Sequence, residues 1–288
     1  MRARYNYKFI SVWFLGVACS LLVSSCLPDP LEVKGIKSIK PQIVVSSQII
    51  PDQTLLVMLT KSFGALEASE DSDPQEVLRQ IAVDDALVTV TGPTQTDTLV
   101  SIGYGLYGGV FIPLEPGAEY TLNVNSTSLG KVTATTTVKP GVTFEDVNAY
   151  LYFDGFDDTL AQVDYMFKDL PEKNYYMVNA TEVEWDELQE DLLNPSGYSR
   201  LLDDNDFTDE YYAESFLVFR REFEKGDTIA VYLSNIDKAY YDFVKLRLDN
   251  RFSFVEYLSE PINYPTNVEG GKGFFNLYIP DIELIVLE

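Results

Sequence analysis

The chain has 288 residues, 46% of them hydrophobic and 23% charged, so it can bury one large core or two ordinary ones and is too apolar for intrinsic disorder. Its 45 acidic and 21 basic residues give a formal net charge of −24, which argues against a nucleic-acid partner because phosphate backbones would be repelled. It contains no histidine, which excludes catalytic triads with an imidazole base and metal sites with histidine ligands.

The first 25 residues have the layout of a secretory signal peptide. Arg2, Arg4 and Lys8 precede an apolar run over residues 9–23, and small residues follow it. As a helix the run would span about 22 Å, less than the ~30 Å hydrocarbon core of a bilayer. We therefore expect residues 1–25 to be removed rather than to stay in the membrane as a transmembrane helix.

Cys26 is the predicted lipidation site. Residues 22–26 (LVSSC) resemble a bacterial lipobox, in which small residues precede a cysteine that is acylated and becomes the first residue of the mature chain. The alternative is an ordinary thiol after an ordinary signal peptide. Acyl chains would tether the protein to the membrane, since each buried CH₂ contributes about 0.8 kcal/mol. Cys19, the only other cysteine, lies in the segment that is removed, so an acylated Cys26 leaves no thiol for a disulfide or a nucleophile.

Composition changes near Lys139-Pro140-Gly141. Residues 27–140 contain five aromatic side chains, whereas residues 141–288 contain 28 and are much more acidic. The change predicts two cores, with a first domain over residues 26–140 and an acidic, aromatic-rich second domain over residues 141–288.

The first domain is predicted to be an immunoglobulin- or fibronectin-like antiparallel β-sandwich. Alternating apolar residues predict its strands over residues 43–50, 54–60, 86–90, 120–124 and 132–138, with a turn at residues 51–53. Residues 73–76 (DPQE) carry the signals that begin a short helix. Residues 114–122 resemble the tyrosine corner of fibronectin type III domains, in which the phenol of a residue such as Tyr120 bonds upstream backbone; the alternative is an ordinary strand tyrosine.

The second domain is predicted to be rich in β-strands with one or two helices. Strands are expected over residues 151–156, 162–167, 175–180, 216–219, 228–233 and 274–279. Ser234 or Asn235 is expected to cap a helix that ends near Asn250, with an apolar stripe from Ile236 to Leu248. A second helix is predicted over residues 182–193.

Several short motifs follow one another in order along the mature chain. They are Ile43-Val44-Val45, residues 85–90, Pro116-Gly117 with residues 120–122, residues 133–138, residues 174–176, residues 226–228, residues 240–243, and Asn267 with Gly271, Gly273 and Phe275. In this order they resemble a large uncharacterised family of Bacteroidota envelope lipoproteins that carries the label DUF4249. Gly270 departs from the asparagine that similar chains often have. The resemblance implies an envelope lipoprotein, often found near TonB-dependent receptors of the outer membrane, and implies no established activity.

Three patterns invite a chemical interpretation. Residues 270–273 (GGKG) lack the Ser or Thr after the lysine that a phosphate loop needs, so a hairpin or a close backbone approach is the better account. Asp204, Asp206, Thr208 and Glu210, and the acids of residues 154–158, could bind calcium, although the glycine of a calcium loop is replaced by Asp209. Paired carboxylates could serve a glycosidase, but no pair is distinguished.

Three tyrosine pairs, Tyr175-Tyr176, Tyr211-Tyr212 and Tyr240-Tyr241, could stack on sugars or peptides. Neighbouring residues on a strand face opposite sides, so we expect one member of each pair to pack in the core and the other to reach solvent.

The sequence thus predicts a noncatalytic lipoprotein of the cell envelope, anchored to the outer membrane by the lipid on Cys26, with the periplasmic or surface face left open. It would be a binding or accessory component of an envelope assembly such as a TonB-dependent receptor system. No catalytic residue, cofactor or metal is predicted. The alternative is a surface protein that binds or acts on glycans.

Overall fold

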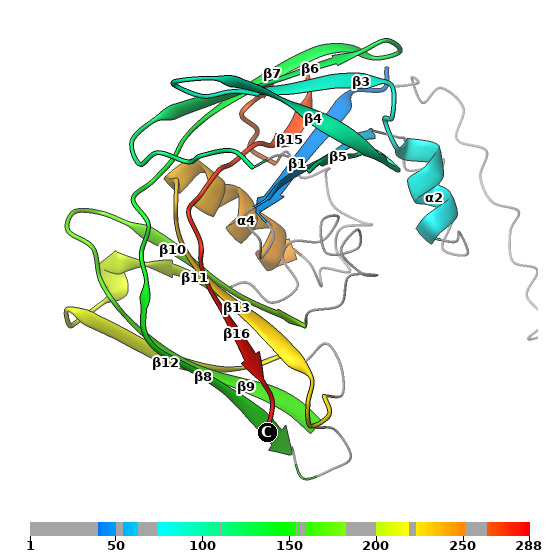
Figure 1. The fold of residues 1–288 in the computed structure, drawn as a ribbon. Helices are drawn as coiled ribbons and strands as arrows, with labels where there is room; N and C mark the ends of the chain where they lie inside the picture. The colour runs from blue at the N-terminus through cyan, green and yellow to red at the C-terminus, as the bar shows by residue number, and fades with distance from the viewer. Residues whose placement is uncertain are drawn as a thin grey trace, which may run out of the picture. The chain divides into compact units, whose positions relative to one another are not determined.

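A computed structural model describes residues 40–49, 54–62, 74–109, 111–153, 155, 159–182, 200–218, 223–250 and 264–288. These residues form the mainly β structure that the sequence predicts, and it has three sheets and two helices (Figure 1). Residues 40–288 are one compact unit. The signal peptide and Cys26 lie outside the described residues, as does the turn at residues 51–53. Within the described ranges, no helix has both the length and the apolar character needed to cross a bilayer.

The first sheet has nine strands, in the order β14-β7-β6-β3-β4-β5-β2-β1-β15. Its strands are β1 (Ile43–Ile49), β2 (Leu55–Lys61), β3 (Ala86–Thr91), β4 (Thr96–Gly103), β5 (Leu106–Gly108), β6 (Glu119–Ser126), β7 (Gly130–Thr137), β14 (Val268–Glu269) and β15 (Lys272–Phe274). Neighbours are antiparallel, except that β1 and β15 are parallel. All five predicted strands of this half are present. The alternation does not reveal β4, because Val100 and Ile102 on this strand are exposed.

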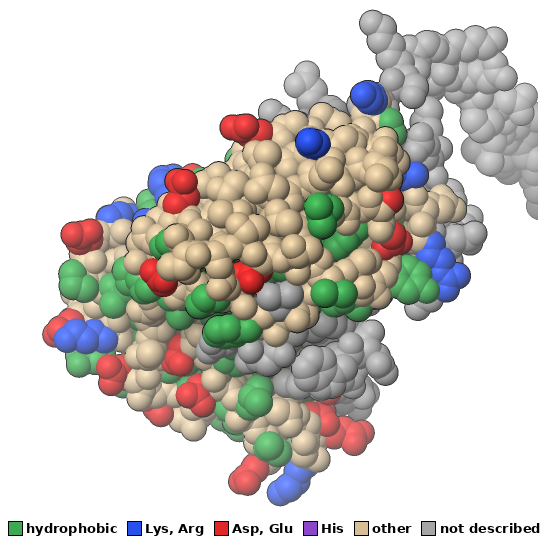
Figure 2. Space-filling model, turned by 45° about the horizontal axis from the view of Figure 1, so that its top comes forward, with side chains coloured by type: hydrophobic (Ala, Val, Ile, Leu, Met, Phe, Trp, Pro, Cys, Tyr) green, Lys and Arg blue, Asp and Glu red, His purple; other side chains and the backbone are tan. Residues whose placement is uncertain are grey.

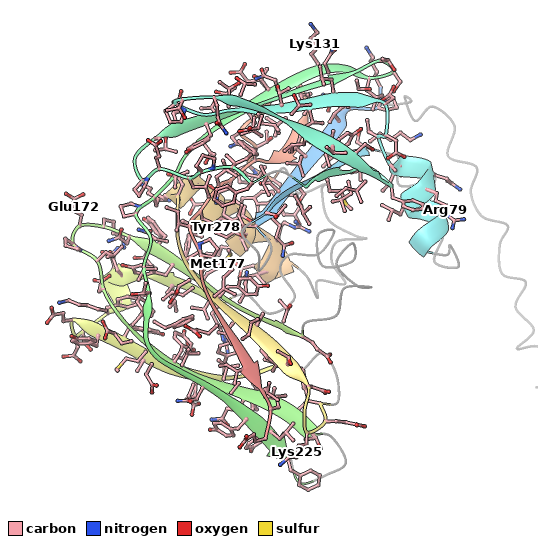
Figure 3. All side chains as sticks on the ribbon, viewed as in Figure 1. Arg79, Lys131, Glu172, Met177, Lys225 and Tyr278 are labelled. Atoms are coloured by element: carbon pink, nitrogen blue, oxygen red, sulfur yellow. The ribbon has the colours of Figure 1, made fainter. Side chains whose placement is uncertain are left out.

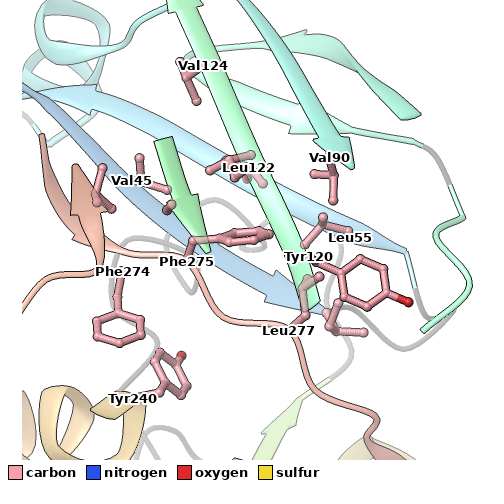
Figure 4. Close-up of a cluster of buried hydrophobic side chains, with 14 of the residues drawn as sticks. Val45, Leu55, Val90, Tyr120, Leu122, Val124, Tyr240, Phe274, Phe275 and Leu277 are labelled. Carbon is pink, nitrogen blue, oxygen red and sulfur yellow. The ribbon is translucent and has the colours of Figure 1, made fainter. Parts of the chain in front are cut away.

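The sheet encloses a core to which its strands contribute alternate residues. Val45, Leu55, Val90, Leu122 and Val124 all belong to one buried cluster (Figure 4). In β2 the predicted alternation holds for Leu55, Val57 and Leu59, which enter this cluster, while Leu56 and Met58 are buried on the opposite side with Leu106. The short helix α2 (Pro74–Ile81) occurs where the sequence predicts it.

The predicted tyrosine corner is confirmed. The Tyr120 hydroxyl donates to the Pro113 carbonyl oxygen at 2.7 Å and accepts from the Glu115 amide at 2.9 Å. A related arrangement occurs later in the chain, where the Tyr176 hydroxyl donates to Asp169 at 2.6 Å and accepts from the Leu170 amide at 2.9 Å. Each buried phenol therefore satisfies its polar atom while its ring fills a core.

The end of the chain returns to the first sheet and completes its core. β14 pairs with β7, and β15 pairs with β1. A Cβ atom on Gly271 would lie 2.6 Å from the Ile43 carbonyl oxygen, and one on Gly273 would overlap the Val45 carbonyl oxygen. Residues 270–273 therefore make the close backbone approach that the sequence predicts, which only glycine permits.

Asn267 fastens this returning segment. Its amide nitrogen donates to the carbonyl oxygens of Phe275 at 2.7 Å and Thr135 at 3.0 Å, and its oxygen accepts from the Phe275 amide at 2.9 Å. Phe275 is fully buried in the first core. The predicted division at residue 140 therefore does not hold for residues 264–278. These residues pair with strands of the first sheet, and their apolar side chains are buried in its core.

The other two sheets form a second sandwich. One has the order β11-β10-β13-β16 and the other β12-β9-β8. The strands are β8 (Phe144–Phe153), β9 (Thr159–Lys168), β10 (Tyr175–Glu182), β11 (Arg200–Asp203), β12 (Tyr211–Val218), β13 (Thr228–Ile236) and β16 (Asp281–Val286). Their facing side chains make a second buried cluster. Met177 and Tyr278, which Figure 3 labels, belong instead to the first cluster, and so do buried side chains of α4 (Lys238–Asn250).

The predicted last strand and the predicted start of the helix need correction in this half. The last strand is Asp281–Val286, not residues 274–279, because Phe274, Phe275 and Leu277 are buried in the first core. The helix begins after Asp237, whose carboxylate accepts from the Ala239 amide at 2.8 Å; the predicted cap residues 234 and 235 belong to β13. Residues 183–199, which contain most of the predicted second helix, lie outside the described residues, and Glu182 ends β10.

Asp85 accepts hydrogen bonds from the turn between β6 and β7, and we expect it to make a pH-dependent contribution to stability. Side-chain hydrogen bonds from Thr127 and then Ser126 lower the pKa of Asp85 to about 2. A depressed folded-state pKa contributes stability above the unfolded value of roughly 3.9, and the contribution is lost as the pH falls toward 2. Asp85→Asn is expected to lower the free energy of unfolding by about 0.5–1 kcal/mol at pH 7, a small effect because the carboxylate is exposed. Urea unfolding of both proteins should show this difference shrinking at pH 2.5; a difference that is the same at both pH values would contradict the prediction.

Candidate binding surface

The outer face of the three-stranded sheet β12-β9-β8 carries a group of exposed and half-buried side chains, most of them aromatic or polar. We name this surface the tyrosine face. It consists of Asn148, Tyr150 and Tyr152 on β8, Gln162 and Asp164 on β9, and Ser215 and Leu217 on β12. The registers place Tyr150 opposite Gln162, and Asp164 between Asn148 and Ser215. Residues from three strands thus meet on one face of the sheet.

Strand periodicity explains why these side chains point outward. Val147, Ala149 and Leu151 of β8 pack against the second core, so the alternate residues of this strand face solvent. On β9, Val163 and Tyr165 are buried, which turns Gln162 and Asp164 to the outer side. The tyrosine face is therefore built by the same alternation that builds the core beneath it.

Asp164 lies at the centre of a hydrogen-bond network. Its carboxylate accepts from the Gln162 amide at 2.9 Å and from the Tyr150 hydroxyl at 3.0 Å, and the Ser215 hydroxyl also bonds to it. Desolvation alone would raise the pKa of Asp164, but these three hydrogen bonds together outweigh it and the pKa is lowered. Asp164 is therefore ionised at neutral pH and acts as an acceptor that orients its neighbours.

Two tyrosine rings of this surface are available to solvent. Tyr150 is 38% exposed and Tyr152 is 40% exposed. The hydrogen bond from its hydroxyl to Asp164 holds the Tyr150 ring in place. In the sheet register, Tyr152 pairs with Leu160, which is buried. Desolvation, followed by the hydrogen bond to Asp164, raises the pKa of Tyr150, so its hydroxyl keeps its proton.

A stack of aromatic rings supports the sheet from within. The ring centroids of Phe207 and Tyr212 are 4.3 Å apart, and those of Phe167 and Tyr176 are 4.9 Å apart. The buried Tyr165 hydroxyl donates to Glu214 at 2.7 Å, and burial raises the pKa of this tyrosine strongly. These contacts make the sheet rigid, so the positions of the tyrosine rings on its outer face are fixed by the packing beneath them.

The three tyrosine pairs behave according to their secondary structure. Tyr175-Tyr176 and Tyr211-Tyr212 lie on strands, and each has one more buried member, Tyr176 and Tyr212. Tyr240-Tyr241 lies on α4, where both side chains are buried. The expectation of one buried and one exposed tyrosine is wrong for this pair, because neighbouring positions on a helix are not on opposite sides.

Two of the residues that could bind calcium, Asp204 and Glu210, are engaged in other contacts. Asp204 accepts from the Lys173 ammonium group, and Glu210 forms an ion pair with Lys168 at 2.6 Å. Throughout the part of the chain that the structure describes, no three acidic or cysteine side chains are grouped so that they could hold a metal ion. Outside this part lie Asp154 and residues 156–158. The arrangement therefore gives the calcium hypothesis no support.

Sequence reasoning places a strand near the tyrosine face but does not identify the surface itself. The predicted strand begins at Leu151, whereas β8 begins at Phe144. The available signal is the alternation of Val147, Ala149 and Leu151 with polar and aromatic residues between them. The contribution of β12 could not be read in this way, since its pairing with β9 joins residues far apart in the chain.

Comparison with known proteins gives a family. A segment of two fibronectin type III domains from chicken tenascin is similar at 8% sequence identity and a TM-score of 0.21, with 86% of this chain and 98% of that chain covered. No curated protein matches the sequence. Residues 28–280 match the family described as Domain of unknown function (DUF4249), and the chain therefore belongs to that family.

Proposed function

We propose that this chain is a noncatalytic lipoprotein of the outer membrane in Bacteroidota, tethered by an acylated Cys26, which binds a partner in an envelope assembly such as a TonB-dependent receptor system. The signal-peptide layout and the lipobox-like residues 22–26 support the tether. The tyrosine face supports binding: it presents exposed rings and oriented polar groups on a sheet held by a packed core.

The electrostatics of Asp164 do not suit the general acid of a glycosidase. A glycosidase needs a general acid whose pKa is raised, so that the carboxyl keeps a proton to donate. The pKa of Asp164 is lowered by its three hydrogen-bond donors. This carboxylate is therefore unsuited to proton donation at neutral pH, and its hydrogen bonds orient the neighbouring Gln162 and Tyr150 side chains.

The tether is tested by Cys26→Ser in the native host. The wild-type protein is expected to incorporate labelled palmitate and to remain with the membrane fraction, because each buried CH₂ of an acyl chain contributes about 0.8 kcal/mol. The Cys26→Ser protein is expected to carry no label and to leave that fraction. Cys19→Ser is the matched control and should behave as wild type. Label retained by Cys26→Ser would overturn the tether.

The accessory role is tested by isolating the lipidated protein from native membranes after chemical crosslinking. A TonB-dependent receptor recovered in a constant ratio is the expected result. Recovery of the protein free of any such receptor would contradict this part of the proposal and leave the tether standing.

A further inference from the structure

We infer that the tyrosine face binds an uncharged oligosaccharide. The inference rests on the proposed function only in that a binding protein needs a ligand. It does not depend on whether Cys26 is acylated. It follows from three features of the surface: the placement of two rings, the kind of polar groups beside them, and the charge.

The rings of Tyr150 and Tyr152 are placed to contact one extended chain of sugars. The two residues alternate with Leu151 on β8, so they lie on the same side of the strand, roughly 6.6 Å apart along it. Each side chain leaves more than a third of its surface to solvent. The apolar CH faces of pyranose rings can cover such aromatic surface, and the hydrogen bond from Tyr150 to Asp164 limits the freedom that binding would remove.

The polar groups beside the rings suit a ligand rich in hydroxyls. Gln162 lies directly opposite Tyr150, and Asn148 and Ser215 lie on either side of Asp164. Amides and hydroxyls can both donate and accept, which matches sugar hydroxyls that do the same. Asp164 orients Gln162 toward this row through the 2.9 Å hydrogen bond. Because Gln162 and Tyr150 are already held by Asp164, binding would restrict few additional polar side chains.

Charge decides between neutral and acidic ligands. The tyrosine face contains no lysine or arginine, and the nearest basic residue of β9, Lys168, is paired with Glu210. Among the described residues that make up the tyrosine face, a carboxylate or sulfate on a glycan would meet no cation, and it would approach a chain with a net charge of −24. An uncharged glycan fits these conditions.

The test uses the full chain carrying Cys26→Ser, so that no detergent is needed. It would be applied to an array of neutral hexasaccharides (malto-, cello-, xylo-, manno- and laminarihexaose) and of acidic ones (oligogalacturonates and sialylated glycans), and the strongest probe would be followed by calorimetry. Binding to at least one neutral hexasaccharide and to no acidic one is the expected result. If none of the neutral hexasaccharides binds at millimolar concentration, or if an acidic glycan binds more tightly than all of them, the inference is wrong.

The variants locate the site. Tyr150→Ala and Tyr152→Ala are each expected to weaken binding by about tenfold, and the Phe variants, which keep the ring, by less than about threefold. Tyr211→Ala is the matched control: it is an exposed tyrosine of the same sheet, 47% exposed, at the far end and beside Lys168. An equal loss in Tyr211→Ala, with unchanged melting temperatures throughout, would place the binding elsewhere. Palmitate labelling and receptor recovery are separate measurements, so failure here is distinguishable from failure of the tether or of the accessory role.

Discussion

Gly273→Ala is expected to lower the free energy of unfolding by about 2–5 kcal/mol or more. Gly273 has a φ of +87°, where a side chain is strained by about 1–2 kcal/mol. In addition, the new Cβ would overlap the carbonyl oxygen of Val45, an atom of the β1 backbone that cannot move without breaking the pairing of β1 with β15. The overlap therefore adds a cost of about 1–3 kcal/mol or more.

Gly130→Ala separates the two causes. Gly130 has a φ of +90°, and a Cβ placed on it would meet nothing within 4 Å. This control therefore carries the backbone strain without the collision and should lose only about 1–2 kcal/mol. Urea unfolding of the two variants and the wild type gives the comparison. Equal losses would show that the close approach of β15 to β1 does not limit the residue at position 273.

Phe275→Ala is expected to destabilise the protein by about 3–5 kcal/mol. The side chain is fully buried, and the same cluster contains Val45 of β1 and Leu122 of β6. Truncation to alanine removes the apolar contacts of the ring and leaves a cavity that a rigid sandwich cannot close completely. Because this residue comes from the last part of the chain, the effect also measures how far the first sandwich depends on the returning segment.

The matched control is Phe111→Ala, a phenylalanine of the first half whose side chain is 62% exposed. This change is expected to alter stability by no more than about 0.5 kcal/mol. Thermal and urea unfolding of both variants check the pair. A loss at Phe275 as small as that at Phe111 would contradict the assignment of the returning segment to the first core.

Both predictions bear on how the two sandwiches are connected. The chain passes from β7 into β8 near residue 140, where composition changes, and later returns to pair with β1 and β7. The returning residues supply polar links as well as apolar ones: Asn276 bonds Ser47 of β1 and Thr136 of β7. Substitutions in this segment are therefore expected to affect residues 40–140, although the two regions are far apart in sequence.

Local sequence signals were sufficient for much of the fold. The alternation of Val88 with Val90, and of Leu122 with Val124, predicts strands whose buried residues are the ones observed. Tyr120 was predicted to form a tyrosine corner, and its hydroxyl makes the expected bonds. In contrast, the cap of α4 was misplaced, because Ser234 and Asn235 are good capping residues that tertiary pairing holds in β13.

The candidate surface shows the same division. The chain by itself determines which residues of β8 point away from the core, since the period of two is a property of the strand. It does not determine that Ser215 lies beside Asp164, or that Gln162 faces Tyr150, because strand register is settled only when distant segments pack together.

What the sequence alone determined is the mainly β class, most strands of both sandwiches, the tyrosine corner and the family resemblance, all of which depend on residues close together in the chain. What the tertiary structure decided is the return of residues 264–278 to the first core, the register of the second sandwich and the assembly of the tyrosine face. The physical reason is that local periodicity sets which side of a strand is buried, whereas the choice of pairing partner depends on shape, hydrogen bonding and burial across the whole fold.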